Sequence, residues 1–404
     1  MPRFHSTLLF ISLLAPWAPA DAYAQAVDDP RPLARLHFGP LAVTPRITVR
    51  DIGVDTNVFN AETGEERDFT MTIMPTADAW LRIGRLHLSS TTGLEWNYYQ
   101  SASEQRAFNL NERLRLDIDL VRVAPYVTGV YERTRRRPSL EIDERVQQLT
   151  KGGGGGIVLN VGPRLDLDLA AQVEDLSYDE GEYGDERLAI ALNRESRELR
   201  VTPRWTLSVL SAFAVRTKMT RDRFEFSPVR DSDSFSIMPG FEFKPLALIS
   251  GDAFVGVRRF NARQAAVPDF TGVVAAVDVL YVMRDMTRFG IKVGRDVEYS
   301  YEPTEPYYIQ SGVNLEVTQA LGGSWDAVGR AGGGRLAYQS LAGLTGAGGD
   351  DRVDRVAEFG GGFGRRLGEQ IRIGLNIDHV SRTSVVAGRS YNGLRVGGAF
   401  TYGY

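Results

Sequence analysis

The sequence predicts an all-β protein, namely a transmembrane antiparallel up-and-down β-barrel of about 18 strands. Three observations support this fold class. Long segments alternate between apolar and polar residues, turn sequences recur roughly every 40 residues, and the chain ends in an alternating strand with aromatic residues.

The alternation is clearest in RLRLDIDL, residues 113–120, where Leu114, Leu116 and Ile118 take every second position. RLDLDLAAQV, residues 164–173, repeats the pattern. Successive side chains of a strand leave opposite faces, whereas a helix would spread these residues around its circumference. A soluble antiparallel sheet with one wet face has the same pattern, so strand length must separate the two classes.

The predicted strands are long, at about 12 to 15 residues, where ordinary globular strands average about 5 to 6. Examples are residues 86–99, 106–120, 164–177, 206–219, 287–300 and 307–320. A tilted strand needs about 9 to 11 residues to cross a bilayer, so these segments are long enough. A β-propeller would show four short strands per repeat, and a soluble sandwich fits the strand length even less well.

Turn sequences divide the chain into hairpins of two long strands. Short turns are predicted at 82–85, 120–123, 160–163, 202–205, 244–247, 283–286, 321–324 and 366–369. Longer polar connections are predicted at 56–67, 100–105, 134–145, 178–189, 220–232, 262–268, 300–306, 340–352 and 382–389. With short turns in the periplasm, both mature termini are periplasmic. None of the longer connections looks long enough to plug a wide lumen alone, which favours an open or partner-gated pore.

The N-terminus has the features of a secretory signal peptide over residues 1–24. Arg3 precedes an apolar run at residues 8–14, and Ala22-Tyr23-Ala24 is a small-residue cleavage site. We therefore expect a signal peptide at 1–24, a short periplasmic segment at 25–42 and the barrel at 43–404. Past the signal peptide we find no apolar run of the about 18 residues that a transmembrane helix requires.

The composition is compatible with an envelope β-barrel and argues against a nucleic-acid partner. The formal net charge is -4, the isoelectric point is about 5.8 and the mean hydropathy is -0.21. Only half of each barrel strand faces lipid, so such a chain has the composition of a soluble protein. A nucleic-acid-binding domain would be basic. The chain contains 0 cysteines, and we expect no cofactor and no bound metal.

The C-terminal strand supports the barrel independently. Leu394, Val396, Gly398, Phe400 and Tyr402 share one face of NGLRVGGAFTYGY. An aromatic end fits the membrane interface. It also resembles the strand that the outer-membrane barrel assembly machinery recognises, and that resemblance implies a barrel-assembly signal at Phe400, Tyr402 and Tyr404. The final residue is Tyr where Phe is commoner.

The charged positions between the leucines are predicted to line a wet lumen. Barrels of about 16 to 18 strands leave an aqueous channel. The candidate lumen residues are Arg113, Arg115, Asp117, Asp119, Asp166, Asp168, Arg200, Arg216, Lys218, Lys292, Arg372 and Arg395. The same alternation adds Glu174, Asp296, Glu298, Glu316 and Asp378. Because both signs of charge are present, we expect no steep ion selectivity.

Four local features do not follow from the alternation. Glu112 and Arg295 interrupt apolar rows, and Arg295 can extend to a lipid headgroup. The glycine run from Gly152 to Gly156 allows bending or close approach within a strand, and no function follows from it. His379 and Ser381 share one face as a nucleophile and base would, yet we see no third member and no G-x-S-x-G motif, so we expect no enzyme.

A family resemblance appears in PRITVRDIGVDTNVFN, residues 45–60. Its G-x-D-x-N-[VI] pattern, here Gly53, Asp55, Asn57 and Val58, resembles the first strand of the putative β-barrel porin 2 family of bacterial outer-membrane proteins. That resemblance implies an outer-membrane barrel in contact with its lipids. The family's association with exopolysaccharide systems implies export of an exopolysaccharide, with a separate periplasmic export protein as partner.

Two other functions stay open at this point. One is a general diffusion porin for small solutes, and the other is a structural or adhesive barrel that transports nothing. The aspartates and asparagines of residues 51–60 lack the ligand spacing of an EF-hand calcium loop, so a role in the turn fits them better.

Overall fold

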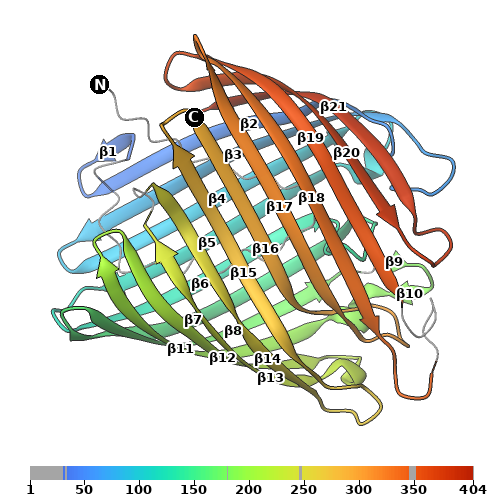
Figure 1. Cartoon of the computed structure of the whole chain (residues 1–404), viewed down its shortest axis with the longest axis horizontal. Coiled ribbons are helices and arrows are strands. Elements are labelled where there is room, and N and C mark those ends of the chain that lie inside the picture. The colour runs from blue at the N-terminus through green and yellow to red at the C-terminus, as the bar shows by residue number, and fades with distance from the viewer. Residues whose placement is uncertain (1–30, 32–33, 180, 245–247, 345–351, 404) are drawn as a thin grey trace.

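The computed structural model describes residues 31, 34–179, 181–244, 248–344 and 352–403. The predicted signal peptide at 1–24 and Tyr404 lie outside the described residues. Over the described part of the chain, eighteen long antiparallel strands form a barrel, which closes where β2 pairs with β21 (Figure 1). The predicted fold class and strand number are therefore confirmed.

The barrel strands follow one another in sequence order around the wall. They are β2 (Leu41–Asp55), β3 (Asp68–Ile83), β4 (Leu86–Tyr99), β5 (Ala107–Ile118), β6 (Val123–Arg136), β7 (Val146–Gly162), β8 (Leu165–Tyr178), β11 (Arg194–Ser208), β12 (Ser211–Phe224), β13 (Ser232–Phe243), β14 (Ile249–Ala262), β15 (Phe270–Met283), β16 (Thr287–Tyr299), β17 (Tyr307–Gly322), β18 (Trp325–Gln339), β19 (Val353–Leu367), β20 (Ile371–Thr383) and β21 (Tyr391–Tyr402).

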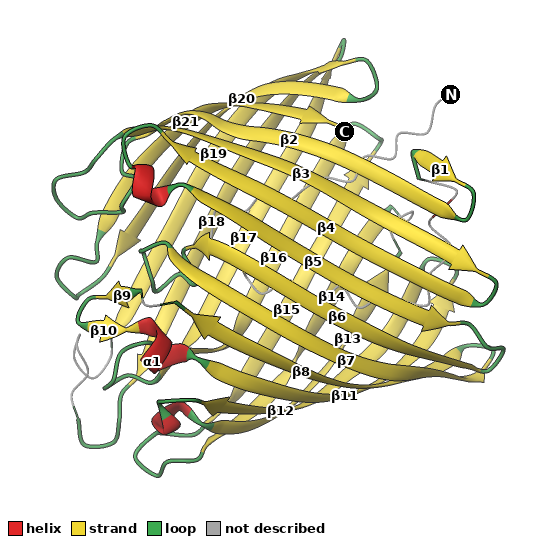
Figure 2. Ribbon diagram, turned by 180° about the vertical axis from the view of Figure 1, so that it is seen from behind, coloured by secondary structure: helices red, strands yellow, loops and turns green. Residues whose placement is uncertain are grey.

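The remaining elements are short and belong to the ends of the barrel. They are β1 (Leu36–Phe38), which pairs with the start of β2, the hairpin of β9 (Glu182–Tyr183) and β10 (Glu186–Arg187), the helix α1 (Leu188–Leu192), and the 3₁₀ turns η2 (Ser103–Gln105) and η3 (Pro228–Arg230). The helical pieces and the β9–β10 hairpin gather at one end of the barrel (Figure 2). In the described part of the chain, no helix is long and apolar enough to span a membrane.

The two ends of the barrel differ in the length of their connections. We call the end with the connections 56–67, 100–106, 137–145, 179–193, 225–231, 263–269, 300–306, 340–352 and 384–390 the long-loop end. The opposite, short-turn end has connections at 84–85, 119–122, 163–164, 209–210, 244–248, 284–286, 323–324 and 368–370. Seven of the eight predicted short turns lie at or next to these positions.

The turn predicted at 202–205 is wrong, because those residues lie inside β11 and the actual turn is Val209–Leu210. The sequence TPRW looks like a break since proline cannot donate a ladder hydrogen bond. In the structure Pro203 pairs in register with Leu167 of β8, and the β11–β12 register is the same at Val201 and at Arg204, on either side of the proline. The strand therefore continues through its proline, and its register with β12 shifts only between Thr206 and Ser208.

The alternation predicted from the sequence runs through the barrel. On β20, Ile373, Leu375 and Ile377 are exposed on the outward face, while Asp378 is buried on the inward face. Glu112 is an outward exception on β5. Its carboxylate accepts hydrogen bonds from the Ser90 and Thr92 hydroxyls of β4, at 2.7 and 2.5 Å.

The family motif lies where the first and last strands close the barrel. The Asp55 carboxylate accepts hydrogen bonds from Arg395 of β21, at 2.8 Å, and from the Asn57 backbone, at 3.0 Å. The Asn57 side chain donates to the Asn392 carbonyl of β21 at 2.9 Å. A Cβ on Gly53 would collide with the β21 backbone at Val396. These residues thus hold the closing seam and the start of loop 56–67, rather than an EF-hand site.

The glycine run in β7 makes room for neighbouring side chains on the inward face. A Cβ on Gly156 would lie 2.5 Å from the ring of Tyr126, which lies across the strand. Cβ atoms on Gly152 and Gly154 would meet Glu174 and Gln172 in the same way, at 2.7 and 2.8 Å. The run therefore lets side chains of β6 and β8 lie flat against the wall, which keeps the wall thin.

Candidate functional site

The inner wall carries the polar side chains that the sequence assigned to a lumen. Eleven of the twelve candidates lie at inward positions of the strands, namely Arg113, Arg115, Asp117, Asp166, Asp168, Arg200, Arg216, Lys218, Lys292, Arg372 and Arg395. Asp119 is different, because β5 ends at Ile118. Asp119 is exposed in the turn that follows, where its backbone N–H bonds the Arg85 carbonyl at 2.8 Å. Alternation alone does not show where a strand ends.

Most of the inward cations are paired with carboxylates of the same strand or of strands nearby. The contacts are Arg113–Glu132 (2.6 Å), Arg115–Asp117 (2.6 Å), Arg200–Glu198 (3.3 Å), Lys218–Glu198 (3.5 Å), Arg204–Glu242 (2.6 Å), Arg216–Asp252 (2.6 Å), Lys292–Asp278 (2.9 Å), Arg330–Asp378 (3.0 Å) and Arg395–Asp55 (2.8 Å), with Arg372 bound to Asp326. The field inside the barrel is therefore mixed in sign around its circumference.

Loop 137–145 crosses from one side of the barrel to the other. It connects β6 with β7, yet it also contacts residues of β17 to β20. Going round the wall from β7, one passes β8, β11, β12, β13, β14, β15 and β16 before reaching β17. The other way from β6 leads through β5, β4, β3, β2 and β21 before β20. The loop therefore reaches across the barrel at the long-loop end. It does so together with other connections, so the expectation that no single loop plugs the lumen alone stays a prediction.

The tip of this loop is anchored by an apolar contact on the far wall. Leu140 packs in a buried cluster with Tyr308 of β17 and with Leu336 and Tyr338 of β18. Val356 of β19 completes the cluster. These wall residues are inward-facing, at positions where a water-filled barrel would carry polar groups. Their apolar character is explained by the loop that covers them.

Arg382 of β20 makes the polar part of the anchor. One guanidinium nitrogen donates to the Leu140 and Glu141 carbonyls, at 3.2 and 3.0 Å, and to the Asp143 carboxylate at 2.6 Å. The other donates to Asp354 of β19 at 2.5 Å. A single buried arginine thus binds Leu140, Glu141 and Asp143 of the loop to the wall.

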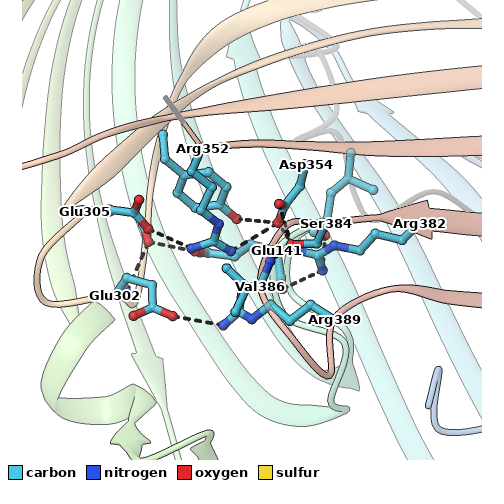
Figure 3. A network of polar contacts seen from close by, with 12 residues as sticks. Glu141, Glu302, Glu305, Arg352, Asp354, Arg382, Ser384, Val386 and Arg389 are labelled. Carbon is cyan, nitrogen blue, oxygen red and sulfur yellow. Dashed lines mark hydrogen bonds and ion pairs between the residues drawn. The ribbon is translucent and has the colours of Figure 1, made fainter. Parts of the chain in front are cut away.

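Asp354 joins Arg382 to the other loops (Figure 3). It also accepts hydrogen bonds from Arg352 at 3.1 Å and from Ser384 at 2.6 Å. Arg352 donates to Glu305 at 2.7 Å, and both side chains are completely buried. Its guanidinium lies 3.7 Å from the centre of the Tyr338 ring. Connections 300–306, 340–352 and 384–390 therefore share one network, which we call the mouth network.

A second set of contacts ties loop 137–145 to the helix α1. Ile142 packs in a buried cluster with Leu188 and Leu192 of the helix and with Tyr301. The Tyr183 hydroxyl donates to the Asp143 carboxylate at 3.1 Å. The loop is therefore covered by connection 179–193 as well as bound to the far wall.

Glu141 is a fully buried carboxyl among these contacts. It accepts a hydrogen bond from the Ser300 hydroxyl at 2.6 Å and one from the Tyr301 backbone at 3.3 Å. Burial raises the pKa of Glu141 to about 7, against the opposing effects of Ser300 and of Arg389. The docked loop therefore contains a carboxyl that changes charge near neutral pH.

The sequence did not predict the mouth network. The apolar part of the network does leave a signal in the sequence. Tyr308, Leu336 and Val356 are apolar residues at inward positions, where the alternation of their strands otherwise places polar residues.

The candidate catalytic pair lies elsewhere, because His379 and Ser381 are on the outward face of β20, away from the lumen. Among the described residues, no group of three or more His, Asp or Glu is placed to hold a metal ion.

Comparison with known proteins identifies one family and several solved barrels. The family model described as putative beta-barrel porin 2 matches residues 36–401. No curated protein matches the sequence. The chain is similar to OccK2 (OpdF) of Pseudomonas aeruginosa in complex with glucuronate, with 13% identity, a TM-score of 0.49, and coverage of 89% of this chain and 98% of that chain. It is also similar to the outer membrane protein OpdK of Pseudomonas aeruginosa, with 9% identity, a TM-score of 0.47, and coverage of 89% and 98%.

Proposed function

The chain belongs to the putative beta-barrel porin 2 family, and we propose that it is a diffusion channel for small hydrophilic solutes in the bacterial outer membrane. The observation that carries this proposal is loop 137–145, which reaches across a polar-walled barrel and is anchored on the far wall. We infer that it narrows the mouth of the lumen. Solutes would pass beside the loop, along walls whose cations are paired with carboxylates. We expect weak ion selectivity for that reason.

We infer that the long-loop end faces the cell exterior. β2 begins and β21 ends at the short-turn end, since Leu41 pairs with Leu81 and Tyr402 with Ile371. Bacterial barrels have short periplasmic turns and longer outer loops. Phe400 and Tyr402 then lie near the periplasmic interface, as a signal for the barrel assembly machinery requires. The cleaved signal peptide belongs to the same proposal.

Small-solute diffusion fits the mouth better than export of an exopolysaccharide with a periplasmic partner. A polymer chain would need loop 137–145 to leave its place, and that breaks both the Leu140 cluster and the bonds to Arg382. A structural barrel without transport would have no need of a wall lined by inward charges. Polymer export and a structural barrel each predict a single-channel conductance that differs from that of a diffusion channel.

The test is single-channel conductance of the refolded protein in planar bilayers. We compare the native chain with a variant in which residues 138–143 are replaced by Gly and Ser, which removes the loop's anchors. We expect a steady conductance for the native chain and a severalfold larger one for the variant. Phe226→Ser is the control, since Phe226 is an exposed residue of another long-loop connection.

Each outcome discriminates between the candidate functions. Silence of both proteins would overturn the channel. Silence of the native chain with conductance of the variant would indicate a closed pore that a partner must open, which favours export. Equal conductance of both would show that the loop does not narrow the path.

A further inference from the structure

Exposed basic residues on the outward face gather near the long-loop end of the barrel. They are Arg133, Lys151, Arg197, Arg221, Arg259, Arg335 and Arg355, each within a few residues of the strand end next to a long loop. Among the described strands, Arg365 of β19 is the outward arginine near the short-turn end. This asymmetry concerns the face that contacts lipid, so the lumen does not explain it.

Arg335 of β18 and Arg355 of β19 form the most unusual part of this distribution. They are directly opposite each other in the strand register, so two like charges point outward side by side. Like charges at such positions destabilise a sheet. Among the described residues, neither guanidinium has a hydrogen bond or an ion pair. The pair therefore lacks a counter-anion from the protein.

The row continues across the neighbouring strands. Ser311 of β17 lies opposite Arg335, and Arg295 of β16 lies opposite Ser311. Arg295 donates to the Ser311 hydroxyl at 2.7 Å, which holds its guanidinium level with the others. Arg295, Ser311, Arg335 and Arg355 thus form a cationic row on four adjacent strands, which we call the outward arginine row.

Apolar side chains lie directly beside this row, towards the short-turn end. Val313 of β17 and Phe359 of β19 are exposed on the same outward face, at 42% and 58%. A cationic row at the rim with an apolar wall next to it fits an amphiphile that has an anionic head. Guanidinium groups bind phosphate through two parallel hydrogen bonds, so two neighbouring arginines suit a phosphate well.

A second group of arginines has the same arrangement on the other side of the barrel. Arg197 of β11 lies directly opposite Arg221 of β12. Unlike Arg335 and Arg355, these arginines have carboxylate partners, since Arg197 pairs with Glu195 at 2.5 Å. Asp233 is shared by Arg221 at 3.9 Å and Arg223 at 2.6 Å, so the cations still outnumber the carboxylates there. Leu199, next to Arg197 on the same face, is 58% exposed.

We propose that the outward arginine row binds the phosphate groups of a phosphorylated glycolipid in the outer leaflet of the outer membrane. The acyl chains of the lipid lie along Val313 and Phe359. This inference rests on the orientation given under the proposed function, because only the outer rim meets that leaflet. The second arginine group around Arg197 and Arg221 is a further site for the same lipid.

The test is native mass spectrometry of the detergent-purified protein with three lipids. These are a diphosphorylated lipid A, the same lipid without phosphates, and phosphatidylglycerol. The variant is R335Q/R355Q, and the control is Arg365→Gln, an outward arginine on the same strand at the opposite end. We expect the double variant to bind diphosphorylated lipid A at least about tenfold more weakly than the native chain. We expect the control to bind it as the native chain does.

Four results would overturn the proposal. The first is binding of diphosphorylated lipid A by R335Q/R355Q at the native level, and the second is equal binding of lipid A with and without phosphates. The third is equal loss of binding in Arg365→Gln, and the fourth is equal binding of phosphatidylglycerol by the native chain, which would assign the row to anionic phospholipid. Unchanged conductance of R335Q/R355Q shows that the barrel is folded. Labelling Phe226→Cys on intact cells with a membrane-impermeant maleimide tests the orientation separately, so its failure is distinguishable from failure of lipid binding.

Discussion

The mouth network and the mid-barrel wall both use ion pairs between a basic side chain and a carboxylate, in two different environments. In the mouth, Arg352, Glu305 and Asp354 are completely buried and join separate loops. On the wall, Lys292 and Asp278 are 27% and 41% exposed and lie directly opposite each other on adjacent strands. The mouth pairs therefore determine where loops sit, whereas the wall pairs are positioned by the sheet.

This difference determines what each pair contributes. A buried ion pair that loses one partner leaves an uncompensated charge, which costs about 3–5 kcal/mol. A partly exposed pair is worth about 0–1 kcal/mol, because solvent screens it. Changes in the mouth should therefore move loop 137–145, whereas changes on the wall should alter the electric field of the lumen and little else.

The largest effect is expected for Asp354→Ala. This change removes the acceptor that Arg352 and Arg382 share, and we expect loop docking to lose about 3–5 kcal/mol. Hydrogen exchange of residues 138–145 and trypsin cleavage at Arg137 and Arg145 should both increase by about a hundredfold or more, since each 1.4 kcal/mol is about a factor of ten. Asp278→Ala on the wall is the matched control. Unchanged protection of the loop in Asp354→Ala would refute the role of the mouth network.

Leu140→Ala should have the next largest effect. The side chain is 7% exposed and packs on Tyr308 and Leu336, so truncation should cost about 2–4 kcal/mol of loop docking. Single-channel conductance should rise, with more frequent transitions between levels. Val121→Ala, in a short turn where the side chain is 86% exposed, should change neither. Equal conductance of Leu140→Ala and the native chain would mean that the apolar anchor does not hold the loop.

A pH effect of intermediate size is expected from Glu141. Its pKa is raised to about 7 in the docked loop from an ordinary 4.5, so the docked form binds the proton more tightly than the free loop. Docking is then strongest below about pH 4.5 and weakens as the pH rises through 7. Conductance should increase over this range in the native chain and stay level in Glu141→Gln. A decrease with rising pH would contradict the burial of the carboxyl.

The smallest effect on stability is expected for Lys292→Gln. The change removes one wall cation and leaves Asp278 unpaired, so the barrel should lose less than about 1 kcal/mol. The reversal potential in a salt gradient should shift towards cation selectivity, because the lumen gains net negative charge. Arg365→Gln, on the outward face, should leave the reversal potential unchanged. A large fall in thermal stability without a shift in selectivity would place Lys292 outside the conducting path.

The sequence by itself predicted the barrel, its strand number and the inward side chains of the wall. Period-two alternation reports which face a residue takes, and this is a local property of a strand. The turn signals failed at Pro203, where a turn-like sequence lies within β11, and the alternation failed at Asp119, where the strand has already ended. Both failures concern strand boundaries, which depend on the neighbouring strands as much as on the residue itself.

Only the tertiary structure determined the mouth. Leu140 and Tyr308 are far apart in the chain, and the strands that flank loop 137–145 lie across the barrel from β17, so their contact exists only after the barrel has closed. Arg382 reads locally like any other inward arginine, yet it binds the loop because β20 faces the connection between β6 and β7. Alternation along a strand indicates the face a side chain takes. Which loop occupies the space beyond that face depends on contacts between distant segments, and local sequence patterns do not record them.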